Sequence, residues 1–312
     1  MTRFFLVLLA LVAFAAPTAA QKRIALTFDD VPRRPGAFLT PDERTDRLIA
    51  ALRRSRVPQA AFFVTTGNLE RDHGAGGERR ITAYVAAGHV IANHSHRHLW
   101  ATRTPVADYV ADLDRAAAWL RGRPGYRPWF RFPFLDEGRD TRERRDALRT
   151  ALARRGLSSG YVTVDSYDWY LEDLTRAAAS AGHEIDRTAL RRLYVDAIVG
   201  AADFSDRIAA DALGRSPAHV LLLHETDLAA LFIADVAAAL RADGWEIVSA
   251  DEAYRDPIAA IEPDSMFLGA GRVAGIANAR GRPRAELVPE WNEESYLARL
   301  FNERVLHQRA AP

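Results

Sequence analysis

The stretch RIALTFDD, residues 23–30, places two adjacent carboxylates directly after a short apolar run. A nearly continuous apolar run of this length is typical of a parallel strand that helices cover. We therefore expect a buried strand over residues 23–28. Asp29 and Asp30 then follow at its carboxyl end.

Similar runs recur along the chain, and helical patterns separate them. The other predicted strands are 60–65, 89–93, 129–134, 160–165, 219–224 and 245–249. The predicted helices are 42–55, 79–87, 105–121, 141–155, 188–213 and 228–243. This repeated order predicts an α/β fold with parallel strands. Periodicity alone does not decide whether the strands close into a barrel or remain an open sheet.

Two regions depart from this order. Residues 170–217 are long for one crossover and mostly helical, which indicates a helical insertion on the rim of the domain. After about Tyr254 the strand patterns stop, and a helix is expected over 290–308. We therefore expect a main domain over 21–252 and an extension, 253–312, that packs on it.

The first twenty residues have the pattern of a secretory signal peptide. A single charge at Arg3 precedes an apolar run over 4–16, and small residues follow up to Ala20. The run is shorter than the about 20 residues that span a bilayer. We expect an exported protein, periplasmic or secreted, with no membrane span.

Charge and cysteine content narrow the classes of partner. The chain has 42 lysine and arginine residues against 41 acidic ones, so removal of Arg3 with the leader leaves 41 against 41. A neutral chain has no long-range field to attract nucleic acid, and no such partner is expected. An exported chain without cysteine must be stabilised by its core. The oligomeric state stays open.

Chemically active side chains follow several of the predicted strands. Because the carboxyl ends of parallel strands form one rim, we expect these residues to meet there. They are Asp29, Asp30, His94, His98, Arg131, Asp165, Asp168 and His224.

The segment ANHSHRHL, residues 92–99, holds three of the nine histidines. His94 and His98 are four residues apart, so on a helical turn both imidazoles face one side and suit one cation. A borderline metal such as zinc needs a further ligand, often a carboxylate, and Asp29 or Asp30 could supply it. His96 points elsewhere, as a supporting or surface residue. The same spacing also occurs in surface and packing pairs.

Five motifs together resemble those of the polysaccharide deacetylases, carbohydrate esterase family four. In order they are LTFDD (26–30), HSHRH (94–98), RFPF (131–134), DSYDW (165–169) and LLLH (221–224). The resemblance covers about residues 22–250. It implies a distorted (β/α)7-type barrel with parallel strands and one divalent metal ion. It also implies an acetylated glycan as substrate, from which N- or O-acetyl groups are removed.

The resemblance assigns a metal site and a base. Asp30, His94 and His98 would hold the metal, with zinc the first candidate and cobalt or nickel alternatives. Asp29 would be the general base, and Arg131 would orient it.

The resemblance also assigns an acid and a pocket. His224 would be the general acid, held by Asp168. The backbone N–H of Phe134 would stabilise the oxyanion. Trp169 and Leu222 would surround the acetyl methyl group.

One position departs from the family pattern, because Val31 stands where glycine is usual. The motifs, together with this departure, leave three hypotheses about the function. The first is an N-deacetylase that acts on peptidoglycan or a chitin-like glycan. The second is an O-acetyl esterase on xylan or another acetylated polysaccharide. The third is a metal-bearing, catalytically silent glycan-binding protein.

Overall fold

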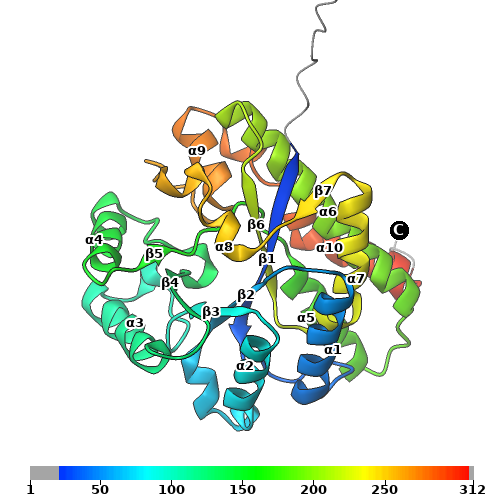
Figure 1. Cartoon of the computed structure of the whole chain (residues 1–312). Coiled ribbons are helices and arrows are strands. Elements are labelled where there is room, and N and C mark those ends of the chain that lie inside the picture. The colour runs from blue at the N-terminus through cyan, green and yellow to red at the C-terminus, as the bar shows by residue number, and fades with distance from the viewer. Residues whose placement is uncertain (1–20, 309–312) are drawn as a thin grey trace, which may run out of the picture.

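The computed structural model describes residues 21–308, so the predicted signal peptide lies outside the described residues. Helices surround a set of parallel strands, with β1 at the centre (Figure 1). The strands are β1 (Lys22–Val31), β2 (Ala61–Val64), β3 (Val90–Asn93), β4 (Tyr126–Phe130), β5 (Ser158–Ser159), β6 (Ala218–His224) and β7 (Trp245–Ile247). The helices are α1 (Pro41–Arg54), α2 (Gly77–Ala86), α3 (Val106–Leu120), α4 (Arg142–Ala153), α5 (Asp168–Ser180), α6 (Arg187–Leu213), α7 (Asp227–Ala242), α8 (Ala250–Ala253), α9 (Arg272–Ala279) and α10 (Glu294–Leu300).

The strands form a distorted barrel. Their order is β5-β4-β3-β2-β1-β6, and β7 pairs with the start of β1. The segment after β5 closes the ring. Gly160 N–H donates to the Phe130 carbonyl, and Val164 forms a parallel bridge with Leu221 of β6. The predicted α/β fold is confirmed, and the strands form a barrel rather than an open sheet.

Two predicted strands are displaced. The strand expected over 160–165 is wrong, because β5 comprises only Ser158–Ser159 and Val164 makes an isolated bridge. The strand expected over 129–134 is Tyr126–Phe130, so Arg131 follows it. A 3₁₀ turn over Pro133–Leu135 ends the extended backbone there.

The end of the chain also differs from the prediction. The helix expected over 290–308 is a 3₁₀ turn at Glu290–Asn292, then α10, then a π-helical turn at Phe301–Val305. The last turn packs against α6. No helix in residues 21–308 is long and apolar enough to cross a membrane.

Side chains of β1 alternate between two apolar clusters. Leu26 and Phe28 belong to the larger cluster, beneath the helices, whereas Ala25 belongs to the smaller one. In the larger cluster, the Phe62 ring stacks on Phe28 and on Tyr84, with centroid distances of 5.1 and 3.9 Å. Alternating burial of this kind lets a strand pack on both faces.

We predict that Phe62→Ala lowers the free energy of unfolding by about 3–5 kcal/mol, because it leaves a cavity in a closely packed aromatic stack. Chemical denaturation measures the change. Ile261→Ala, which truncates an exposed side chain, is the control and should change stability by less than about 0.5 kcal/mol. Equal losses in the two variants would contradict this account of the core.

Candidate active site

An irregularity at the end of β1 brings two adjacent carboxylates into one cavity. Successive side chains of a regular strand point to opposite faces. Here the pairing register with β2 shifts between Phe28 and Val31, and Asp30 has a left-handed φ of 67°. Such a bulge re-aims a side chain. As a result, Asp29 and Asp30 line the same cavity.

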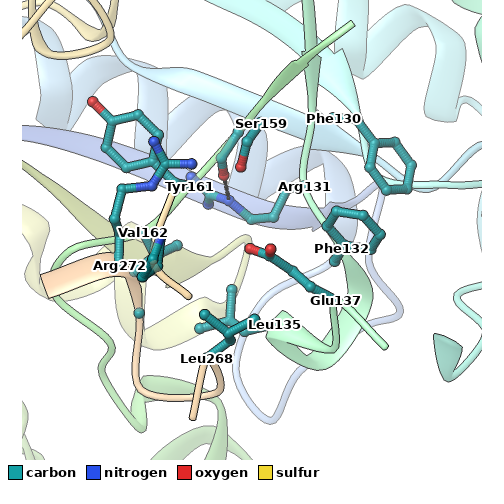
Figure 2. Close-up of a pocket in the computed structure, with 13 residues that line it drawn as sticks. Phe130, Arg131, Phe132, Leu135, Glu137, Ser159, Tyr161, Val162, Leu268 and Arg272 are labelled. Atoms are coloured by element: carbon teal, nitrogen blue, oxygen red, sulfur yellow. Dashed lines mark hydrogen bonds between the residues drawn. The ribbon is translucent and has the colours of Figure 1, made fainter. Parts of the chain in front are cut away.

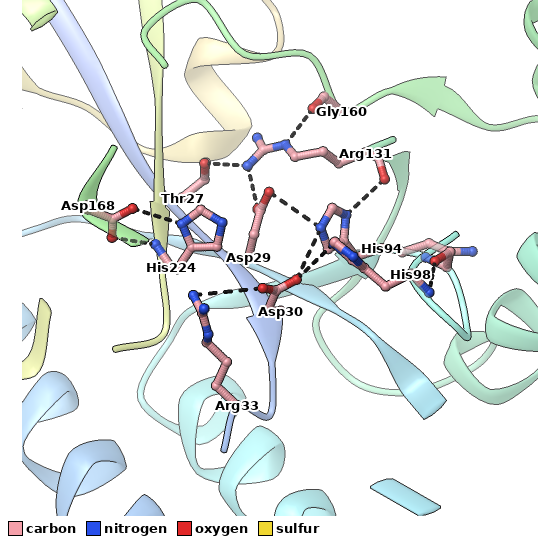
Figure 3. Close-up of polar contacts among 12 residues, drawn as sticks. Thr27, Asp29, Asp30, Arg33, His94, His98, Arg131, Gly160, Asp168 and His224 are labelled. Carbon is pink, nitrogen blue, oxygen red and sulfur yellow. Dashed lines mark hydrogen bonds and ion pairs between the residues drawn. The ribbon is translucent and has the colours of Figure 1, made fainter. Parts of the chain in front are cut away.

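Asp29 forms a buried ion pair with Arg131. Arg131 Nη1 lies 2.6 Å from Asp29 Oδ1, and both side chains are almost fully buried. Arg131 also donates to Thr27 Oγ1, to the Gly160 carbonyl and to the hydroxyl of Tyr254. These bonds occupy its three nitrogens and fix the plane of the guanidinium group. Asp29 is thereby held in one orientation (Figure 3).

Asp30, His94 and His98 form a compact group in which one ligand atom of each residue lies within 4.8 Å of the others. Asp30 Oδ1 is 3.5 Å from His94 Nε2 and 3.1 Å from His98 Nε2. The His94 Nδ1–H donates to the carbonyl of Arg131, which leaves Nε2 as the free nitrogen. Burial lowers the pKa of His94 to about 4, so its imidazole is neutral at neutral pH.

This group fits a divalent cation. Two imidazoles and one carboxylate form a donor set that suits zinc, with room for a further ligand. The carbonyl that accepts from His94 is the kind of outer partner that orients a metal-bound histidine. Burial alone would raise the pKa of Asp30, but the positive charges of His98 and Arg33 outweigh it and hold this pKa well below its usual value.

A second pair lies on the other side of Asp29 and Asp30 (Figure 3). His224, at the end of β6, donates from Nδ1 to Asp168 Oδ1 over 2.8 Å, and its backbone N–H donates to Asp168 Oδ2. Burial of His224 opposes its protonation, but the Asp168 carboxylate outweighs this effect and raises the pKa of His224. The remaining nitrogen, Nε2, is free to exchange a proton.

The cavity at this rim has a volume of about 470 Å³, which suits a small-molecule or oligosaccharide fragment. Arg131 and Asp168 lie behind it and hold the residues that line it. The lining includes nine residues singled out from the sequence: Asp29, Asp30, His94, His98, Phe134, Asp165, Trp169, Leu222 and His224. The structure therefore brings these side chains together, and their individual roles stay predictions.

Three features of the surroundings bear on what the sequence suggested: His96 points away from the cavity as predicted, whereas the insertion does not lie where it was expected. His96 is buried, not on the surface, and its Nδ1 lies 2.9 Å from Thr66 Oγ1, away from the cavity. Val31 is fully buried in β1, so the usual glycine is replaced without a break in the strand. The insertion over 170–217 contributes no lining residue, because α6 packs on α7 and α9.

The C-terminal extension, not the insertion, forms part of the wall. Gly269 and Glu294 line the cavity. Asn292 donates to the carboxylate of Asp165, which also lines it. Burial raises the pKa of Asp165 to about 7. Of these four residues, only Asp165 belongs to a motif recognised in the sequence, as the first residue of DSYDW.

Several other lining residues carried no recognisable signal in the sequence. They are Arg33, Trp100, Leu135 and Arg139, whereas the lining residues Phe132 and Tyr167 lie within RFPF and DSYDW without having been assigned a role. A separate cavity of about 20 Å³ adjoins Arg131 and is bounded by Glu137, Tyr161 and Arg272 (Figure 2). Its volume suits a single water molecule.

Comparison with known proteins relates part of this chain to a family. The model described as "Polysaccharide deacetylase" matches residues 16–153. This match covers the first three of the five motifs and part of the chain up to residue 153, and it agrees with the resemblance that the motifs suggested. Among curated proteins, none matches.

Several solved structures are similar to the chain. A family 4 carbohydrate esterase from Streptomyces lividans, in complex with acetate, is 26% identical, with a TM-score of 0.47 over 72% of this chain and 90% of the other. A peptidoglycan deacetylase from Bacillus subtilis is 19% identical, with a TM-score of 0.46 over 74% and 89%. A family pseudoenzyme from Bacillus anthracis is 18% identical, with a TM-score of 0.48 over 76% and 66%.

We predict that Asp168→Asn lowers the pKa of His224, because the charge that favours the imidazolium is removed. Titration of the His224 ring protons by NMR measures it. Because the pKa of His224 is higher in the folded than in the unfolded state, its interaction with Asp168 stabilises the folded protein at low pH. This stabilisation is lost as the pH rises through the pKa of His224 in the folded state. The stability lost in Asp168→Asn should therefore be larger in acid than in base. Asp173→Asn, on the same helix, should leave the pKa unchanged.

Proposed function

We propose that this protein is a metal-dependent deacetylase that removes N-acetyl groups from a glycan of the peptidoglycan or chitin type. One observation carries the proposal: the Asp29–Arg131 pair and the His224–Asp168 pair flank the Asp30, His94 and His98 group. Hydrolysis of an amide needs a base for the attacking water and an acid for the leaving nitrogen. The match of residues 16–153 to the polysaccharide deacetylase model supports this assignment.

Asp30, His94 and His98 would hold the divalent ion, with zinc the first candidate. When bound, such an ion acidifies a water molecule and polarises the acetyl carbonyl. Asp29 accepts the proton of the attacking water, and Arg131 keeps its carboxylate aimed at the cavity. The fixed orientation reduces the reorganisation needed during reaction.

On the opposite side, His224 supplies a proton to the leaving nitrogen. The hydrogen bond to Asp168 fixes its tautomer, so the proton is delivered from Nε2. The raised pKa favours a protonated imidazole at the start of this step. Trp169 and Leu222 line the cavity where an acetyl methyl group would be enclosed, and the Phe134 backbone N–H would face the oxyanion.

The substrate and the location follow from the same proposal. An acetylated glycan outside the cytoplasm matches the N-terminal signal pattern, so the mature enzyme would act in the periplasm or as a secreted protein.

The protein purified with zinc should release acetate from N-acetylglucosamine oligomers or from acetylated cell-wall glycan. We expect Asp29→Asn to lower the rate by about 10²–10⁴-fold, because the attacking water loses its base. Asp46→Asn, an exposed change on α1, is the matched control and should leave the rate unaltered. No acetate from any acetylated sugar with metal present would refute the proposal.

We predict that His94→Ala and His98→Ala each reduce the bound metal to well below one ion per chain, because two ligands remain. Elemental analysis after dialysis measures the content, and circular dichroism checks the fold. His183→Ala removes an exposed imidazole as the control. Undiminished metal content in both site variants would place the ion elsewhere.

Rates on N-acetyl and O-acetyl sugars, measured side by side, decide between amide and ester. Both reactions pass through a tetrahedral intermediate and need the same base, so the comparison of rates is the discriminating measurement. Faster acetate release from acetylated xylan than from N-acetylglucosamine oligomers would assign the protein as an esterase.

A further inference from the structure

Arg33 has a fixed backbone beside the candidate active site. It lies in the loop between β1 and α1, three residues after Asp30. Its backbone N–H donates to Glu225 Oε2 over 2.7 Å, and its carbonyl accepts from the buried Arg44. The loop is thereby tied to the barrel, and the Arg33 side chain extends from a rigid base.

The guanidinium group of Arg33 lines the cavity with its donors unused. Within residues 21–308 it donates no hydrogen bond, and Nη1 is buried without an acceptor. Its charge partner is Asp30, whose Oδ2 lies 3.7 Å from Nη1 (Figure 3). That separation is short enough for attraction but too long for a hydrogen bond. Arg131, by contrast, donates from all three nitrogens.

A buried donor without an acceptor is unfavourable, and a bound acceptor removes the cost. The side chain of Arg33 is only 15% exposed, so water reaches it poorly. Its position next to Asp30 places these donors within the same cavity as His224. A ligand group that binds there would lie close to the reacting acetyl group.

The charges around the cavity favour an anionic ligand group at Arg33. Asp29 is neutralised by Arg131, and Asp30 faces two imidazoles. A second guanidinium, Arg139, lines the same cavity, with its partner Asp136 at 4.0 Å. Besides Asp29 and Asp30, the lining carboxylates that oppose an anion are Asp165, whose pKa burial raises to about 7, and Glu294, which comes from the extension.

We propose that Arg33 binds a carboxylate carried by the acylated sugar, so that the protein prefers an anionic glycan to a neutral one. This inference rests on the proposed function and narrows its substrate class. A guanidinium presents paired donors that match the two oxygens of a carboxylate. The carboxylate can belong to a lactyl ether on the sugar or to a uronic acid.

The test is a binding measurement that needs no turnover. The full chain carrying Asp29→Asn, loaded with zinc, is titrated calorimetrically with three tetrasaccharides. One contains only N-acetylglucosamine, one has a lactyl ether on every second sugar, and one has a uronic acid on every second sugar. We expect one carboxylated ligand to bind about tenfold tighter or more than the neutral one. The tighter of the two identifies the source of the carboxylate.

Arg33→Gln in the same background should abolish this preference while leaving affinity for the neutral ligand nearly unchanged, and Arg33→Lys should restore part of it. Arg34→Gln is the matched control, because Arg34 is the neighbouring residue, half exposed and paired with Asp173. Metal content and thermal stability check that the site is intact.

Equal affinity for neutral and carboxylated ligands would overturn the inference. So would a loss on Arg33→Gln that is the same for all three ligands, because that pattern assigns Arg33 to the orientation of Asp30. Absence of binding by every ligand would also overturn it. Failure of the proposed function is seen separately, as absence of acetate release from the unaltered protein.

Discussion

The buried ion pair between Asp29 and Arg131 organises the candidate site. Burying two charges is costly unless their geometry is good and their remaining hydrogen-bonding groups are satisfied. Both conditions hold here, because Arg131 also donates to Thr27, Gly160 and Tyr254. These partners come from β1, the closing segment after β5 and the end of α8. The guanidinium group of Arg131 therefore links the parts of the barrel that position Asp29.

Backbone strain is concentrated at the same rim. Asp30, Ser95, His98 and Phe134 all have positive φ, although none is glycine. Such conformations are unfavourable and persist where the surrounding structure enforces them. Here Asn93 supports the segment, since its side-chain oxygen accepts from the Ser95 N–H. The strain turns Asp30 and the two histidines toward one point, which regular strands and turns would not do.

The sequence predicted those parts of the fold that depend on continuous apolar runs. β1 and β6 are long strands with a neighbour on each side, and the predicted positions of both agree with the structure within a few residues. The strand predicted over 160–165 was wrong, because this apolar segment forms a single bridge with β6 in place of a continuous ladder of hydrogen bonds. The sequence did not single out three residues at the cavity, Arg33, Glu294 and Asn292, because none of them belongs to a recognised motif. Their positions depend on tertiary packing of a loop and of the C-terminal extension, which local patterns do not encode.

The boundaries of the family match also divide the site. Asp29, Asp30 and the two histidines lie within residues 16–153, whereas Asp168 and His224 lie beyond them. The proposed base and the proposed metal ligands therefore belong to the first part of the barrel, and the His224–Asp168 pair belongs to the second. β1 joins the two, because it pairs with β2 through its second half and with β6 along most of its length. The register Asp29↔His224 sets these two residues side by side on neighbouring strands. A shift of this one pairing by a residue would turn His224 to the opposite face and separate the two groups.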